Sequence, residues 1–410
     1  MKKFFALLLS LAMVLALVAC GQKDPTPDTP DTPDDPQTKV EYKVAMITDY
    51  GDITDQSFNQ TTYEACKAFA EDNSIEFSYF KPAGDNTADR VAMIEKAVDE
   101  GFNVIVMPGY AFGGAIVEAA PEFPDVKFIA LDVAADDLLE TAVAKAGEAY
   151  DYTPENWDLN KYVDMSNVYC AVYQEELCGY MAGYAAVKLG YKNLGFLGGM
   201  SVPAVVRYGY GFVQGVDAAA ADLGLTDVKL NYIYGGQFFG DADITAVMDT
   251  WYQGGTEVVF ACGGGIYTSA VDAAKKVGAK VIGVDVDQAG VIANYAGVDG
   301  MTVTSAMKGL YPATYDTLTD VIVNGNWEKY VGKIETLGLV SGTDPEANYV
   351  QIPMGDGTQW SDSFTQDDYK AMVKDMFDGK ITVSNNTSSD VSAADFATVI
   401  TVDDQGSIKG

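Results

Sequence analysis

Three acids spaced three residues apart, Asp49, Asp52 and Asp55, lie in the stretch of this sequence most suited to chemistry, "TDYGDITDQSFNQ" at residues 48–60. An EF-hand calcium loop needs a closer acid spacing and a closing glutamate, and this stretch has neither. The acids also lack an identifiable catalytic partner. The pattern therefore favours one wall of a binding pocket for a neutral polar ligand. Asp52 and Asp55 are expected to shape the loop or to cap the helix that begins near Asn59.

The sequence contains no histidine. This excludes Ser-His-Asp and Cys-His nucleophilic catalysis and histidine-ligated zinc hydrolysis, whereas catalysis by carboxylates alone, as in glycoside hydrolysis, stays open. Cys66, Cys170, Cys178 and Cys262 form no Cys-x-x-Cys pair, so we expect small buried residues, with one disulfide left open. Neither a metal site nor a cofactor is predicted.

The N-terminal segment predicts where the protein works. Residues 1–19 have two lysines, an apolar stretch and then small residues, which is the layout of a signal peptide. The apolar stretch is shorter than the ~20 residues of a membrane span, and a Pro/Asp-rich tract follows it. The letters "LVAC", which end at Cys20, resemble a bacterial lipobox, in which the cysteine becomes the lipidated N-terminus. We therefore expect a lipoprotein anchored on the extracytoplasmic face of the cell membrane.

The composition of the chain predicts a tether and limits the class of binding partner. Residues 20–39 repeat proline, aspartate and threonine without any large apolar side chain, so they are expected to form a disordered tether. The chain carries 26 basic and 59 acidic side chains, a formal net charge of −33. So negative a charge disfavours binding to nucleic acid or to anionic lipid as the function.

Short apolar segments alternate with amphipathic helical patterns from residue 40 onward, except in the acidic, tyrosine-rich stretch 133–166, which is interpreted as an insertion or a long connection. The alternation predicts two lobes, each a parallel sheet with helices on both faces. We expect an N-terminal lobe from 40–166 plus about 300–330 and a C-terminal lobe from 167–299 plus about 331–410. Strands are predicted at 42–48, 75–80, 103–108, 126–132, 167–173, 193–199, 228–236, 256–264 and 279–285, after 301, and at 379–384.

Polar, glycine and aromatic residues follow these strands. Because ligands of open α/β sheets bind at the carboxyl ends of the strands, Asp49, Asp132 and Asp285 are candidates for one cleft, although a single aspartate in this position often caps the next helix instead. The glycine-rich stretches "PGYAFGG" and "CGGGIY" match no phosphate-binding motif. A nucleotide phosphate site is therefore not expected.

Several segments together resemble the basic membrane protein family, whose members are substrate-binding lipoproteins of ABC transporters; the characterised members bind purine or other nucleosides. The resemblance covers about 41–325 and implies a type I periplasmic-binding-protein fold, with two doubly wound parallel-sheet lobes that close on the ligand about a multi-strand hinge. The segments are "VAMITDYGDITDQSFNQ", "VKFIALD", "LGFLGGMSVPAVVRYGYGF", "VFACGGG", "VIGVDVDQ" and "TSAMKG".

The resemblance also implies roles for single residues. Asp49 would contact a base, and Phe58, flanked by Ser57 and Asn59, would stack on one face of it. Tyr208 stands where many members have a phenylalanine that stacks on the opposite face, and its hydroxyl could alter which base fits. The residues on the ribose side would be Asp132, Gly264, Asp285 and Lys308.

The expected function is that of a membrane-anchored binding protein that delivers a nucleoside, with a purine base in the first place, to the permease subunits of an ABC importer without turnover. A sugar or another small polar metabolite is the alternative ligand, because a pyranose ring can stack on the same aromatic residues. A carboxylate-based hydrolase lacks a recognisable catalytic constellation. A surface adhesin or a sensing partner would leave the cleft residues unexplained.

Overall fold

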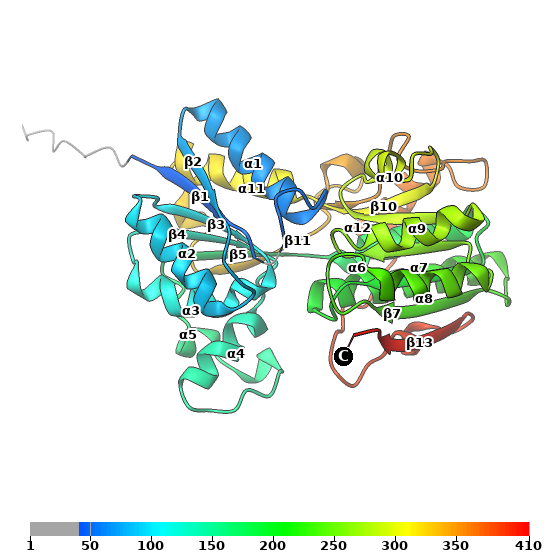
Figure 1. The fold of residues 1–410 in the computed structure, drawn as a ribbon, viewed down its shortest axis with the longest axis horizontal. Coiled ribbons are helices and arrows are strands. Elements are labelled where there is room, and N and C mark those ends of the chain that lie inside the picture. The colour runs from blue at the N-terminus through cyan, green and yellow to red at the C-terminus, as the bar shows by residue number, and fades with distance from the viewer. Residues whose placement is uncertain (1–40, 50, 410) are drawn as a thin grey trace, which may run out of the picture. The chain divides into compact units, whose positions relative to one another are not determined.

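Two sheets organise the chain, and helices pack on them (Figure 1). The structure is a computed structural model that describes residues 41–49 and 51–409. The expected signal peptide (1–19), the lipidated Cys20 and the tether (20–39) lie outside the described residues and stay predictions. The description below concerns the compact unit Tyr42–Gly410.

The N-terminal lobe is built on a six-stranded parallel sheet with the order β11-β5-β4-β3-β1-β2. Its central strands are buried on both faces, which explains their continuous apolar sequences. The strands are β1 (Lys43–Ile47), β2 (Glu76–Phe80), β3 (Val104–Pro108), β4 (Lys127–Leu131), β5 (Val168–Tyr173) and β11 (Lys333–Leu337). The helices are α1 (Phe58–Asn73), α2 (Thr87–Asp99), α3 (Gly113–Ala119), α4 (Ala135–Lys145), α5 (Leu159–Tyr162) and α11 (Leu310–Leu318).

The C-terminal lobe has a seven-stranded sheet with the order β12-β10-β9-β8-β6-β7-β13, in which only the β10–β12 pair is antiparallel. Its strands are β6 (Asn193–Gly198), β7 (Lys229–Tyr234), β8 (Val258–Cys262), β9 (Lys280–Asp285), β10 (Thr302–Lys308), β12 (Val350–Gln351) and β13 (Thr401–Ser407). Its helices are α6 (Glu175–Lys188), α7 (Pro203–Leu223), α8 (Ala242–Gln253), α9 (Tyr267–Val277), α10 (Ala289–Ala296) and α12 (Gln366–Phe377).

Helices α6 and α7 form the tightest contact of this lobe. Gly211 and Gly215 of α7 lie directly against the backbone carbonyls of Glu176 and Tyr180 of α6, where a Cβ atom would overlap them. The expected burial of the cysteines is confirmed, since all four described cysteines are buried and free. The remaining short helices are η1 (Tyr110–Phe112), η2 (Ala120–Glu122), η3 (Pro154–Asn156), the π-helical η4 (Thr319–Val323), η5 (Trp327–Lys329), η6 (Pro345–Ala347) and η7 (Ala393–Phe396).

Three strands lie in the lobe opposite to the one expected. Strand β5 pairs with β4, and β11 pairs with β5, so both belong to the N-terminal sheet, whereas β10 pairs with β9 in the C-terminal sheet. The chain therefore crosses between the lobes at Gln174, at Gly309 and along 338–349. The apolar pattern of a buried strand predicts that it is buried but not which sheet receives it, which is why the expected boundaries differ.

The strand predicted at 379–384 is absent, because these residues are irregular. The backbone of Ser384 instead exchanges hydrogen bonds of 2.8 and 3.0 Å with the side-chain amide of Gln214 on α7. A side chain therefore takes the place of a strand partner, and β13 supplies the outer strand next to β7. The stretch 133–166 folds as α4, η3 and α5 within the N-terminal lobe.

Glu176, at the start of α6, generates a prediction about stability. Its side chain is buried, and its Oε2 atom has no hydrogen-bond partner in the described part of the chain. Burial, reinforced by Glu175, raises the pKa of Glu176 from 4.5 to about 7. The folded protein therefore retains a proton that the unfolded chain loses, and the stability that this proton confers is full below pH 4.5 and lost as the pH rises through 7.

We predict that Glu176→Gln raises the free energy of unfolding by up to about 3 kcal/mol at pH 8, and with it the thermal midpoint relative to the native chain, but not at pH 5. Circular dichroism melts at the two pH values measure this difference, with the exposed Glu118→Gln as the control. An equal difference at both pH values would contradict the raised pKa, because Glu176 would then be ionised in the folded protein at pH 5 as well as at pH 8.

Candidate ligand-binding site

The carboxyl ends of the two sheets face one pocket, with about 860 Å³ of unoccupied space including its opening to solvent. Ligand pockets of this fold class form at the carboxyl ends of strands, because the loops that follow each strand gather there. Residues Asp49, Asp55, Phe58, Asn59, Tyr110, Asp132 and Asp137 line it from the N-terminal lobe, and Val202, Arg207, Tyr208, Phe238, Cys262, Gly264, Asp285 and Lys308 line it from the C-terminal lobe.

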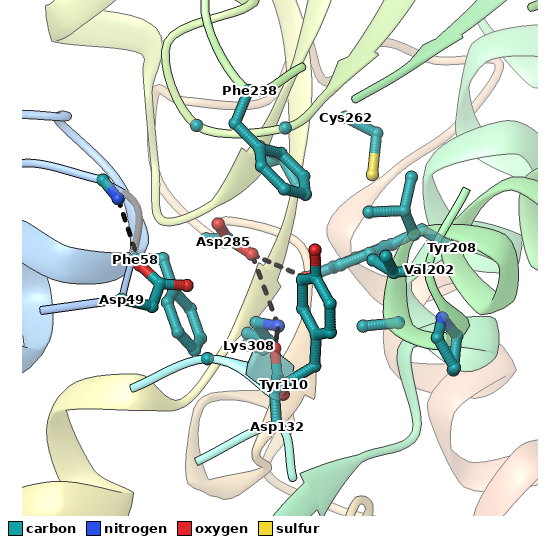
Figure 2. Close-up of a pocket in the computed structure, with 18 of the residues that line it drawn as sticks. Asp49, Phe58, Tyr110, Asp132, Val202, Tyr208, Phe238, Cys262, Asp285 and Lys308 are labelled. Atoms are coloured by element: carbon teal, nitrogen blue, oxygen red, sulfur yellow. Dashed lines mark hydrogen bonds and ion pairs between the residues drawn. The ribbon is translucent and has the colours of Figure 1, made fainter. Parts of the chain in front are cut away.

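Lys308, the last residue of β10, holds the charged centre of this pocket (Figure 2). Its side chain is 3 % exposed, and its Nζ lies 2.5 Å from Asp132, 3.4 Å from Glu175 and 3.8 Å from an oxygen of Asp285. Burial alone would lower the pKa of the Lys308 ammonium, but the three carboxylates outweigh burial and raise this pKa. Lys308 is therefore a permanent cation.

Aromatic rings surround the same ammonium group. Its Nζ lies 4.7 Å from the ring centre of Phe58, 5.3 Å from that of Tyr173 and 5.7 Å from that of Tyr208. These separations are within the range of cation–π attraction. The cation is thus held by carboxylates and ring faces from both lobes.

Asp132 and Asp285 occupy equivalent positions in the two lobes, just after β4 and at the end of β9. Both adopt the left-handed backbone conformation, with φ of 59° and 64°, which is uncommon for residues other than glycine. Such strain is retained where the surrounding structure imposes it, frequently at functional sites. Burial raises the pKa of Asp132 to about 6, against the opposing charge of Lys308 and with a contribution from Glu175.

One carboxylate oxygen of Asp132 remains available. Its Oδ2 contacts Lys308, whereas its buried Oδ1 has no hydrogen-bond partner among the described residues. A buried oxygen without a partner is costly, so this oxygen is a candidate acceptor for a ligand donor.

Phe58 begins α1 and lines the pocket from the N-terminal lobe. The preceding loop is organised by Asp55, whose carboxylate accepts hydrogen bonds from the backbone N–H groups of Ser57, Asn59 and Gln60 at 2.9–3.1 Å. The expectation that Asp55 shapes this loop is confirmed. Asp55 therefore fixes the ring of Phe58 by holding the first turn of its helix.

Ser57 connects the lobes and is not among the residues that line the pocket. It is fully buried, and its Oγ donates a 2.5 Å hydrogen bond to Oδ2 of Asp285. Close by, the side-chain amide of Gln288 donates to the carbonyl of Gln56 at 3.2 Å. With the Lys308–Asp132 pair, these contacts hold the lobes together across the pocket.

Tyr208 has contacts that differ from those expected of a stacking ring. It is 2 % exposed, its ring meets that of Phe260 edge to face at 5.9 Å, and its hydroxyl donates to Oδ1 of Asp285 at 3.2 Å. In this structure Tyr208 orients Asp285 from the pocket wall. The expected stacking of Tyr208 on a ligand would use the part of its ring that Phe260 and Lys308 do not cover.

Phe238, in the loop after β7, presents a second ring to the pocket (Figure 2). This ring lies against Gly199 and Gly263, where a Cβ atom on either residue would come within 3.1 Å of it. The sequence analysis expected glycine and aromatic residues after the strands but did not single out Phe238. The signal was present, because glycines on the neighbouring loops leave room for a large side chain.

Asp49 and Tyr110 complete the N-terminal side. The carboxylate of Asp49 accepts a 3.1 Å hydrogen bond from the N–H of Gly51 and lies against Gly109, whose φ of 126° and close approach exclude a side chain there. Burial, reinforced by Asp49, raises the pKa of Tyr110 to about 12, so its hydroxyl stays neutral. This hydroxyl also contacts the sulfur of Met200 in the other lobe at 3.7 Å.

The reactive groups of the pocket are carboxylates, two cations and one thiol. Cys262 lines it, but burial raises the pKa of this thiol, so the nucleophilic thiolate is disfavoured. No group of three or more acidic or cysteine side chains in the described part of the chain is arranged to hold a metal ion. What the pocket offers is aromatic faces, carboxylate acceptors and one ammonium donor.

Two parallel-sheet lobes around such a pocket define a type I periplasmic-binding-protein fold, as the sequence predicted. A solute-binding protein of an ABC transporter system from Aeropyrum pernix K1 has this fold, with a TM-score of 0.59 and 20% identity over 84% of this chain and 88% of that chain. Residues 42–343 match the family described as "ABC transporter substrate-binding protein PnrA-like", and the chain belongs to this family. It is a family of substrate-binding proteins and not of enzymes.

Curated relatives span most of the chain. The ABC transporter nucleoside-binding protein BmpA of Lactococcus lactis subsp. cremoris is 25% identical over 392 residues, which cover 92% of this chain and 96% of that protein. An uncharacterised lipoprotein of Pyrococcus abyssi is 26% identical over 320 residues, covering 74% of this chain and 69% of that protein. Among the residues that the structure describes, no helix has the length and apolar character needed to cross a membrane.

We predict that Lys308→Met lowers the stability of the folded protein by about 3–5 kcal/mol at pH 8, because it leaves buried carboxylates without their cation. The loss should shrink at pH 5, because Asp132, whose pKa burial raises to about 6, then takes up a proton in the folded protein. Thermal unfolding at both pH values measures this. Lys380→Met, which removes an exposed lysine paired with Asp375, is the control. A loss that does not depend on pH would contradict the charge account.

Proposed function

We propose that this protein binds a nucleoside with a purine base in the pocket around Lys308 and delivers it to the permease of an ABC importer. Lipid on Cys20 would anchor it to the extracytoplasmic face of the cell membrane. The observation that carries the proposal is the pairing of aromatic rings from two lobes with a buried carboxylate and ammonium cluster. The name of the L. lactis relative, a nucleoside-binding protein, supports it.

Phe58 and Phe238 are the rings proposed to hold the base. They belong to different lobes and both line the pocket (Figure 2). Stacking of a base on an aromatic side chain contributes roughly 1–3 kcal/mol by comparison with single-stranded nucleic-acid binders. Asp49 and Asn59, which line the pocket from the lobe of Phe58, are suited to accept hydrogen bonds at the edge of the base. The Oδ1 atom of Asn59 has no partner among the described residues, whereas its amide N–H already donates to Asp55.

The ribose is proposed to bind at Lys308. Its ammonium can donate to a ribose hydroxyl, while the partnerless Oδ1 of Asp132 and the carboxylate of Asp285 can accept from hydroxyls. Gly264, with a φ of 50°, lets its backbone approach the sugar. Hydroxyls bridging a cation and two carboxylates are bound well where water is excluded.

The charge of the pocket argues against a phosphorylated ligand. Five aspartates line it, Asp49, Asp55, Asp132, Asp137 and Asp285, against the two cations Arg207 and Lys308. Arg207 is already paired with Glu175 at 2.7 Å, and Lys308 with Asp132. A phosphate group would meet surplus negative charge, so a neutral nucleoside fits better than a nucleotide.

Lobe closure links binding to transport. The contacts Ser57–Asp285 and Lys308–Asp132 join the lobes beside the proposed ribose position. A ligand held by both lobes favours the closed arrangement, because only that arrangement presents both sets of contacts. A permease that binds the closed arrangement would thereby select the loaded protein.

Isothermal titration calorimetry tests this function with inosine, guanosine, adenosine and cytidine, and with ribose, galactose and guanosine monophosphate. The expected result is micromolar or tighter binding of at least one purine nucleoside and no measurable binding of the monophosphate. Preferential binding of galactose or ribose would overturn the nucleoside assignment in favour of a sugar, the alternative ligand.

We predict that Phe58→Ala and Phe238→Ala each weaken binding of a purine nucleoside by roughly 5- to 100-fold, as expected from the loss of one stacked ring. Phe239→Ala is the matched control, since this neighbouring ring is 49 % exposed and does not line the pocket. Calorimetry with the nucleoside that the native chain binds best provides the measurement. Full affinity in either pocket variant would show that the ring replaced in that variant does not stack on the base.

A further inference from the structure

The C-terminal end of the described chain reaches the loop that carries Phe238. Strand β13 lies parallel to β7 at the edge of the C-terminal sheet, beyond the residues 42–343 that match the family. The contact continues past the strand, because the N–H of Ile408 donates a 2.8 Å hydrogen bond to the carbonyl of Tyr234. Lys409 is thereby placed directly beside the loop 235–241.

Lys409 is bound to two side chains of this loop, one on each side of Phe238 in the sequence. Its Nζ donates a 2.9 Å hydrogen bond to Oε1 of Gln237 and pairs with the carboxylate of Asp241. The amide of Gln237 in turn donates to Oδ2 of Asp241 at 3.0 Å and to the carbonyl of Phe239 at 2.9 Å. The ammonium group therefore closes a hydrogen-bonded ring around the segment that holds Phe238.

On its other side, the loop is held by the glycine-rich loop that follows β8. The carbonyl of Phe238 accepts a 2.9 Å hydrogen bond from the N–H of Gly265, and Phe239 forms a bridge with the same glycine. The backbone of Lys409 also packs on Gly236, which has a φ of 79° and where a Cβ atom would overlap Lys409. Pocket and C-terminal end thus hold the loop between them.

We propose that Lys409 is a positioning residue that sets the place of Phe238 in the pocket and so contributes to affinity for the base. The consequence for affinity rests on the proposed function, because it requires Phe238 to stack on a base. Lys409 and Asp241 are 34 % and 27 % exposed, so their ion pair adds little to overall stability. Its effect is local, on the geometry of the loop.

Hydrogen exchange measured by mass spectrometry tests the positioning role without any ligand. The variants are Lys409→Met and Lys409→Arg in the full chain, with Lys380→Met as the charge-matched control. We expect faster exchange in peptides covering residues 234–242 and 263–266 for Lys409→Met, a largely native rate for Lys409→Arg and no change for Lys380→Met. Native exchange rates in Lys409→Met would overturn the proposal.

A double-mutant cycle tests the consequence for binding, with inosine and guanosine as the probes. Lys409→Met should weaken the tighter of the two by roughly 3- to 10-fold, part of the loss from removing a stacked ring, and should cause no further loss in a Phe238→Ala background. Equal losses in both backgrounds would show that Lys409 does not act through Phe238. If the native chain binds no nucleoside, the proposed function fails, and the exchange rates alone decide whether Lys409 positions the loop.

Discussion

The buried ammonium of Lys308 is the interaction on which the arrangement of this site depends. It lies at the end of β10 in one lobe and contacts Asp132 of the other, with Glu175 and Asp285 completing its charged surroundings. A charge removed from water is tolerated only when its partners are close and well oriented. The Lys308–Asp132 pair therefore joins the two lobes across the pocket, together with the Ser57–Asp285 and Gln288–Gln56 hydrogen bonds.

The fold brings these groups together through the ends of its strands. Asp132 and Asp285 hold corresponding positions in two separate sheets, each in a left-handed conformation that turns its carboxylate toward the other lobe. The charged centre is closed off by rings, and the loop after β7 adds Phe238. A ligand with a flat apolar face and several hydroxyls matches this division into an aromatic and a charged region. A nucleoside has both parts in one small neutral molecule, which is why we propose it rather than a nucleotide as the ligand.

Much of this could be predicted from the sequence, and the failures have physical reasons. The strands predicted at 103–108 and 279–285 correspond to β3 and β9, because a strand buried on both faces has a continuous apolar sequence. Strands β5 and β10 were predicted as strands but in the wrong lobe, and the residues of β11 were placed in the wrong lobe without being predicted as a strand. The reason is that an apolar pattern does not specify the neighbouring strand. Phe238 was overlooked because its place depends on Gly199 and Gly263, which are distant in sequence. Lys409 depends likewise on contacts between distant segments.

Mass spectrometry of the small molecule that stays bound to the natively purified protein tests the central claim most directly. The protein would be desalted, denatured to release its contents, and the released molecule identified and counted against the protein. We predict an intact purine nucleoside, close to one per chain, lost when Lys308 is replaced. A sugar, a nucleotide or a free base in its place would contradict the account.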